Sequence, residues 1–181
     1  MRYYKAVLFG SIGTIVETSE IQRRSFNKAF KLCGLNWIWT KNIYKKLLSK
    51  SGGKNRVLRY AKKESLKVDS IKISNLKTRI FNNYLKKKQL KLRPGIKNLI
   101  KKCKKEKIKL AFVTSTSTSN INSIFFSLKK SISKKDFQFI GNKNLSSKVI
   151  SFSKVIPWSL VQLNFIGDWS VNLLFPETDQ I

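Results

Sequence analysis

Residues Lys5-Ala-Val-Leu-Phe9 run directly into Gly10-Ser-Ile-Gly-Thr14, and this stretch decides the fold. The first five residues have the apolar pattern of a short strand, and the next five have the small side chains of a turn. In α/β proteins, a buried strand of this kind ends in a loop at the carboxyl edge of the sheet, where ligands bind. We therefore expect residues 10–14 to border a ligand site.

Helical patterns follow this loop. Ser19-Glu-Ile-Gln22 has the spacing of a capping box, which predicts a helix that begins at Ser19. Apolar residues then recur at helical spacing as far as Cys33, and Gly34 is the expected end of the helix. Three further helices are expected over residues 41–50, 54–64 and 70–88.

A second alternation of helices and strands begins at Pro94, which suits the first turn of a helix. Strands are expected over residues 108–113 and 137–140, with a helix around residues 121–128 between them. This order predicts an α/β fold, in which a parallel sheet carries an all-helical insertion after its first strand. The expected domains are a core of residues 1–16 and 94–181 and a helical insertion of residues 17–93.

The amino-acid composition excludes several classes of catalytic and metal-binding site. The 181 residues, of which 41% are hydrophobic, are enough for one folded domain or a core with a modest insertion. The absence of histidine excludes Ser-His and Cys-His nucleophile pairs, imidazole bases and His-ligated metals. Cys33 and Cys103 have no zinc or redox spacing, so we expect buried, reduced thiols. The apolar stretch 6–16 is too short for a membrane span and lacks a signal-peptide pattern, so we expect a cytoplasmic protein.

The charge balance is strongly basic, with 38 Lys and Arg against 9 Asp and Glu and a net charge of +29. Two interpretations stay open. One is a polyanionic partner such as nucleic acid, bound through nonspecific charge. The other is an A/T-rich genome, whose codons favour Lys, Asn and Ile. The lysine runs at 86–88 and 101–105 fall on expected helices, where they are typical of solvated faces, and aromatic residues do not interleave with them as in a stacking platform.

Three blocks of the sequence together resemble one known family. They comprise residues 7–14, 16–20 and 22–27, then 34–37 and 52–56, and finally 92–96 and 110–114 with Asn120. The set is similar to the haloacid dehalogenase (HAD) superfamily, and within it to the CbbY-type and β-phosphoglucomutase-like sugar-phosphate phosphatases. The resemblance implies a HAD-like Rossmannoid parallel core, shortened at the C-terminus, with an α-helical cap inserted after strand 1.

The resemblance also locates the family's chemistry. In that family a carboxylate at the end of the first strand attacks phosphorus, and a second one, two residues later, transfers protons. Gly10 and Ile12 occupy these two positions here, and neither can ionise. Ser11 lies between them, but the chain has no histidine to activate it. The resemblance therefore implies an impaired enzyme, because loss of a covalent nucleophile typically costs on the order of 10⁴–10⁶ in turnover.

The same resemblance supplies candidate phosphate-binding residues. Thr114 and the adjacent Ser115 match the hydroxyl motif after a later strand, and Lys148 follows at about the distance of the family's phosphate lysine. For Thr114 an alternative stays open, since a run of hydroxyls at this point also caps a following helix.

Further candidates lie in the insertion and the segment leading to it. By resemblance, Glu17 helps to shape the substrate pocket, and Lys54 and Arg56, after Gly52 and Gly53, hold a distal phosphate. The alternatives are that Glu17 pairs with an arginine of the next helix, and that Lys54 and Arg56 are two more exposed cations.

The part of the chain after Ile140 is short for this family, which carries more than one strand–helix–strand unit there, at about 30 residues each. We expect an internal shortening that removed the acidic motif for Mg²⁺, the cofactor of the family. Asp168, with Asn172, faintly resembles that motif, and the alternative is an ordinary surface acid.

The sequence therefore predicts a HAD-like hydrolase family protein that binds phosphate or a phosphorylated sugar and whose phosphatase chemistry is impaired. Two alternatives remain, an active phosphatase that uses other groups and a cationic protein that binds nucleic acid or another polyanion. No membrane partner is expected.

Overall fold

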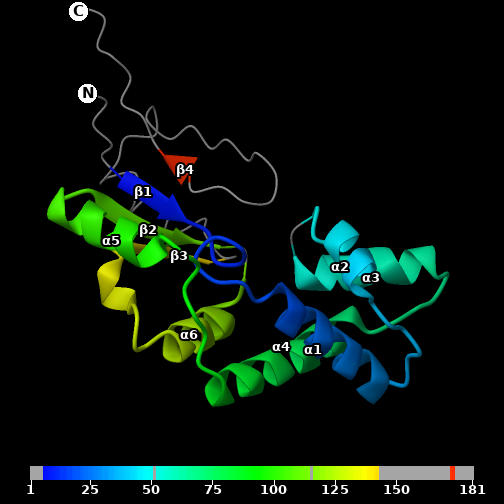
Figure 1. Ribbon diagram of the computed structural model, residues 1–181. Coiled ribbons are helices and arrows are strands. Elements are labelled where there is room, and N and C mark those ends of the chain that lie inside the picture. Colours follow the sequence, from blue (N-terminus) through cyan, green and yellow to red (C-terminus); the bar gives the residue numbers. More distant parts are fainter. Residues whose placement is uncertain (1–5, 51, 115, 143–171, 174–181) are drawn as a thin grey trace, which may run out of the picture. The chain divides into compact units, whose positions relative to one another are not determined.

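The computed structural model describes residues 6–50, 52–114, 116–142 and 172–173 (Figure 1). The chain divides into two compact units. The sheet unit consists of Met1–Glu17, Lys91–Ser117 and Leu128–Ile181, and the helical unit consists of Thr18–Leu90 and Thr118–Ser127.

The sheet unit is built on strands in the order β3-β2-β1-β4. These are β1 (Ala6–Phe9), β2 (Lys109–Val113), β3 (Phe139–Gly141) and β4 (Asn172–Leu173). β2 is parallel to both β1 and β3, which confirms the predicted parallel sheet. β4 was not predicted, and it is antiparallel to β1, with Leu173 opposite Val7.

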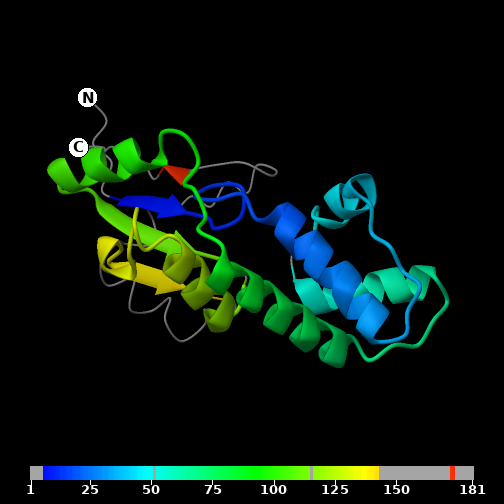
Figure 2. The same cartoon turned by 60° about the horizontal axis from the view of Figure 1, so that its bottom comes forward.

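Burial explains why these segments form strands. All four residues of β1 are buried, as is typical of a parallel strand with both faces covered. The helix α5 (Ile96–Lys105) packs against β2 and lies along the sheet (Figure 2). The ring of Phe137 meets those of Phe9 and Phe112 edge-on, with centroids 6.0 and 5.8 Å away. Phe137 directly follows a short 3₁₀ turn, η1 (Lys134–Asp136).

Five helices form the helical unit, close to the predicted positions. They are α1 (Ser19–Leu32), α2 (Lys41–Leu47), α3 (Gly53–Lys63), α4 (Ser70–Lys87) and α6 (Thr118–Ser127). α6 joins this unit through its packing on α4, and its last residue, Ser127, accepts the Leu90 N–H at its carbonyl at 3.2 Å. The division of the chain at residues 17–93 stays a prediction.

The start of α1 corrects one expectation. The N-cap is Thr18, Ser19 is the first helical residue, and no side chain caps the helix, so the predicted capping box at Ser19 is wrong. The end of the helix is as predicted, because Gly34 follows the C-cap residue Cys33 with a φ of +73°, a conformation that favours glycine.

An aromatic cluster forms the core of the helical unit. Trp39 is fully buried, and its ring lies 4.8 Å from Phe26, 4.7 Å from Phe30 and 5.4 Å from Tyr60, measured between centroids. Aromatic side chains bury large areas, so this cluster dominates the packing of α1 against the segments that follow it. Across the described ranges, no helix is both long and apolar enough to cross a membrane.

Candidate phosphate site

The carboxyl ends of β1 and β2 bring two hydroxyls together. The register pairs Phe9 with Phe112, so the residues that follow the two strands lie at the same edge of the sheet. There the Ser11 Oγ is 2.9 Å from the Thr114 Oγ1, a hydrogen bond in which either hydroxyl is able to donate. Ser11 is buried and Thr114 is half-buried.

The loop after β1 folds back on itself. The Ser11 carbonyl accepts the N–H groups of Ile15 and Val16 at 3.3 Å, and the Gly13 N–H donates to the Val16 carbonyl at 2.8 Å. Gly13 has a φ of +75°, where a side chain would be strained. As the sequence predicts, glycine closes this turn, and the turn fixes Ser11 against the end of β2.

Thr114 is held from two directions. Its N–H donates to the Gly141 carbonyl at 3.1 Å, which ties it to the end of β3. Its Oγ1 accepts the N–H of Thr116 at 3.3 Å, so the hydroxyl also bonds the backbone that leads into α6. The hydroxyl of Thr114 therefore faces Ser11 and supports the turn, and its bond to Thr116 falls before α6, which begins at Thr118.

In the part of the chain that the structure describes, no acidic side chain stands at the two positions that the resemblance assigns to catalytic carboxylates. Gly10 and Ile12 stand at the end of β1, and Glu17, the acid that follows, is exposed. Within the described ranges, no three His, Cys, Asp or Glu residues gather into a possible metal site. Mg²⁺ prefers carboxylate oxygens, so the described residues do not fit this ion.

The arginines of α1 pair with a different acid from the one considered in the sequence. Glu20 binds Arg23 at 2.7 Å and Arg24 at 2.8 Å. The hydrogen bond from Arg23 is the largest cause that lowers the pKa of Glu20 to about 2. Glu20 therefore pairs with both arginines from within the same helix.

The candidate residues of the insertion separate into exposed and buried groups. Gly52 has a φ of +89° and precedes Gly53, the first residue of α3, and Lys54 is exposed. Arg56, in contrast, is buried, and its Nε and Nη2 donate to the carbonyls of Leu47 and Lys50 at 2.8 and 3.1 Å.

This arrangement contradicts the alternative that Arg56 is an exposed cation. Its guanidinium lies 5.5 Å from the centroid of the Tyr44 ring, and burial lowers the pKa of the group. Arg56 therefore closes the C-terminal end of α2, where backbone carbonyls lack helical partners.

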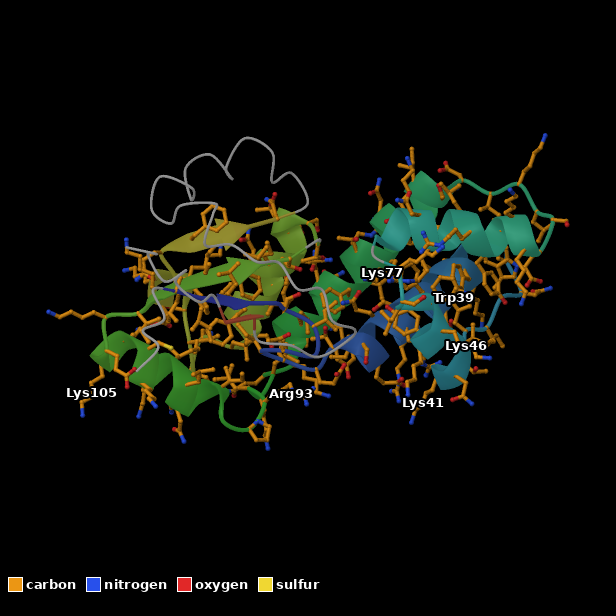
Figure 3. The ribbon with its side chains drawn as sticks, turned by 90° about the horizontal axis from the view of Figure 1, so that it is seen from above. Trp39, Lys41, Lys46, Lys77, Arg93 and Lys105 are labelled. Carbon is orange, nitrogen blue, oxygen red and sulfur yellow. The ribbon has the colours of Figure 1, made fainter. Side chains whose placement is uncertain are left out.

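Lys77 is a feature that the sequence reasoning missed (Figure 3). Its Nζ donates to the Gln22 Oε1 at 2.7 Å and lies 5.0 and 4.9 Å from the ring centroids of Phe26 and Phe81. Burial is the main cause that lowers the pKa of Lys77 to about 7, and the charge of Arg56 adds to the effect. The available signal was its position in α4, one turn from both Ile73 and Phe81 on the apolar stripe.

Three remaining candidates, Ser115, Lys148 and Asp168, lie outside the described residues. The site that the structure describes thus consists of the loop 10–14, the Ser11–Thr114 hydroxyl pair and the backbone around it. It resembles a place for an oxyanion at the carboxyl edge of a parallel sheet.

A parallel sheet with a helical insertion after its first strand is an architecture of α/β hydrolases. Residues 7–145 match the family of haloacid dehalogenase-like hydrolases, and the chain belongs to this family. Members of the family typically depend on Mg²⁺.

Relatives of this chain include the CbbY proteins. CbbY of Cereibacter sphaeroides is 37% identical over 123 residues, and CbbY of Rhodobacter capsulatus is 33% identical over 123 residues. Each match covers 66% of this chain and 54% of the relative, so the chain spans about half the length of these relatives.

Solved structures of related proteins also resemble this chain. CbbY from Rhodobacter sphaeroides in complex with phosphate has a TM-score of 0.71 and 31% identity, and the match covers 79% of this chain and 65% of that one. A mutant of the same protein in complex with xylulose-(1,5)bisphosphate gives the same TM-score at 32% identity and the same coverage. A β-phosphoglucomutase from Thermotoga maritima, at 17% identity and a TM-score of 0.54, shares the fold.

Proposed function

We propose that this chain binds phosphate or a phosphorylated sugar at the carboxyl edge of its sheet and that its phosphatase chemistry is impaired. The observation that carries the proposal is the replacement of both expected acids by Gly10 and Ile12 beside a retained hydroxyl, Thr114. Neither Gly10 nor Ile12 has a carboxylate that could attack phosphorus, move the proton of the leaving oxygen or hold Mg²⁺.

Binding is a separate question from turnover, and the hydroxyl pair supports it. Ser11 and Thr114 lie 2.9 Å apart at the edge where α/β proteins bind ligands, and related CbbY structures hold phosphate and a sugar bisphosphate. Ser115 and Lys148 are proposed to complete the phosphate contacts. Residues 1–16 and 94–181 are proposed as the core, with 17–93 as the cap.

The cap is proposed to contribute to the substrate side of this site. Glu17, Gly52, Gly53 and Lys54 are the proposed contacts. Arg56 is proposed to act through the segment that leads to Gly52, because its Nε and Nη2 donate to the carbonyls of Leu47 and Lys50.

Calorimetry with inorganic phosphate and a turnover assay with xylulose 1,5-bisphosphate and Mg²⁺ test the proposal on the full chain. The expected result is phosphate binding without measurable hydrolysis. Thr114→Val removes the hydroxyl at nearly constant volume and is expected to weaken phosphate binding by about tenfold, which is the effect of one charge-assisted hydrogen bond. Thr114→Ser is the matched control and is expected to keep the affinity.

Two outcomes would overturn this function. Mg²⁺-dependent hydrolysis at rates typical of the family would show that other groups perform the chemistry. An unchanged phosphate affinity in Thr114→Val, in a protein that folds normally by circular dichroism, would remove the hydroxyl pair from the site.

A further inference from the structure

Exposed lysines gather at the edge of the sheet opposite the hydroxyl pair. α5 ends at Lys105 immediately before β2, whose first residue is Lys109, and η1 precedes β3. The amino ends of β2 and β3, the end of α5 and η1 therefore share this edge. We define the basic edge as the exposed residues Lys101, Lys102, Lys104, Lys105, Lys107, Lys109 and Lys135.

An ion pair confirms that the two parts of the basic edge are neighbours. Lys104 on α5 binds Asp136 of η1, although the two residues are far apart in the sequence. Lys102 lies 3.9 Å from Glu106, measured between Nζ and Oε1. Among the described residues, these two acids compensate only part of the charge of the seven lysines, so the edge carries a concentrated positive charge.

The charge is not spread evenly over the sheet unit, as a general bias toward lysine codons would predict. Within the described residues, the segments that leave the carboxyl ends of the strands, residues 10–17, 114, 116–117 and 141–142, contain no lysine or arginine, and Lys143 is the next residue of the sequence. Arg93, whose N–H donates to the Ile15 carbonyl at 2.9 Å, is the neighbouring basic residue. Figure 3 labels Arg93 ahead of α5 and Lys105 at its far end. Among the described residues, more than half of the lysines of the sheet unit thus belong to the basic edge.

One lysine of the edge occupies a conformation that suits glycine better. Lys107 has a φ of +56°, and its N–H donates to the Lys104 carbonyl at 3.2 Å where α5 ends. A non-glycine residue in the left-handed region costs about 1 kcal/mol. A long cationic side chain therefore stands at a position where local geometry alone favours glycine.

The surroundings of these lysines indicate the class of partner. Among the described residues, the exposed large hydrophobic side chains all belong to the helical unit: Leu32, Ile38, Leu58, Leu66, Ile71, Tyr84 and Phe126. Within the described residues, the basic edge thus offers no apolar anchor for a lipid surface and no aromatic platform for unstacked bases. The described basic residues of this edge are lysines, and lysine contacts phosphates as a point charge and does not read bases by bidentate contacts.

We propose that the basic edge binds the phosphodiester backbone of double-stranded nucleic acid without sequence preference, at a surface separate from the phosphate site. A duplex presents its phosphates on the outside, where a row of lysines reaches them without unstacking a base. Four phosphate contacts give a slope of log K against log salt of about −3.6, and nonspecific dissociation constants of about 10⁻⁴–10⁻⁶ M are typical at physiological salt.

Fluorescence anisotropy with labelled DNA and RNA duplexes tests the proposal on the full chain, from about 50 to 200 mM salt. The variant of the basic edge carries Lys101→Gln, Lys105→Gln, Lys107→Gly and Lys109→Gln. The glycine relieves the left-handed backbone at residue 107, so this change does not weaken the fold. DNA duplexes and RNA duplexes are measured separately, so that the affinities for the two kinds of duplex can be compared.

The matched control removes the same charge from exposed lysines of the helical unit: Lys41→Gln, Lys45→Gln, Lys46→Gln and Lys62→Gln. The edge variant is expected to lose on the order of tenfold or more in affinity at low salt and to flatten the salt slope by about three to four, whereas the control keeps both. Phosphate binding by calorimetry is expected to stay unchanged in the edge variant, which separates this proposal from the function of the hydroxyl pair.

Three outcomes overturn the proposal. Equal losses in both variants would mean that total charge, and not the basic edge, binds the duplex. No duplex binding at low salt would remove the surface altogether. Tighter binding to vesicles of anionic phospholipid than to either duplex, lost in the edge variant, would assign the edge to a membrane.

Discussion

Replacing Lys77 by Met is expected to change how the stability of the helical unit depends on pH. The amine is buried beside Phe26 and Phe81, and its pKa is lowered to about 7 from 10.5. Between these two pH values the unfolded chain binds a proton that the folded chain does not. Stability therefore rises with pH across this window, and the cost of burying the charged amine is fully present below about pH 7.

The magnitude follows from the same shift. Each pKa unit corresponds to about 1.4 kcal/mol, so the full window is worth about 5 kcal/mol, of which about 2 kcal/mol falls between pH 7 and pH 9. The two aromatic rings stabilise the charged form by about 1–2 kcal/mol each and reduce the effect. We expect the pH-dependent rise to be present in the original protein and absent in Lys77→Met.

Urea unfolding of the full chain, followed by tryptophan fluorescence at several pH values from about 6 to 10, measures this difference. Arg79→Met is the matched control, because it removes an exposed charge from the middle of the same helix. Its pH profile is expected to follow that of the original protein. Parallel profiles for Lys77→Met and the original protein would refute the idea of a buried, titrating amine.

Three further changes test local interactions within the two units. Arg56→Lys is expected to lower the free energy of unfolding by about 2 kcal/mol, because one amine does not reproduce two guanidinium hydrogen bonds to carbonyls. Equal urea midpoints for this variant and the original protein would contradict the prediction. Asp69→Ala is expected to cost about 1 kcal/mol, since the Asp69 carboxylate caps α4 at the N–H groups of Ile71 and Lys72, and Asp69→Asn should recover most of the loss in the same assay. Gly13→Ala is expected to lower the melting temperature through its positive φ, whereas Gly10→Ala, whose Cβ meets only the movable Thr14 side chain at 3.0 Å, is expected to have a smaller effect.

The sequence predicts the elements of this fold because hydrophobic period reflects burial. The continuous apolar run of β1 and the helical spacing within α4 each describe one face of one element, and both confirm their predictions. β4 escapes this reasoning, since a two-residue strand has no period and its partner, β1, lies at the other end of the chain.

Arg56 and Lys77 show where sequence reasoning fails. Long basic side chains are ordinarily exposed, and both are buried here because aromatic rings from other elements cover them. That covering depends on tertiary packing, which no local pattern encodes. The position of the candidate site is easier to predict from the sequence. The carboxyl ends of paired parallel strands lie at the same edge of a sheet, and this places Ser11 beside Thr114.

The bond between Ser11 and Thr114 limits how many protons this edge presents to an incoming anion. The two hydroxyl groups carry two hydrogens in total, and one of these hydrogens is donated in the bond between Ser11 and Thr114. When Ser11 donates, the Thr114 oxygen receives both that hydrogen and the N–H of Thr116, and its own O–H becomes a more polarised donor. An oxyanion at this edge can therefore accept one strengthened hydrogen bond from the pair. A second O–H donor becomes available only when the hydrogen bond between the two hydroxyls breaks.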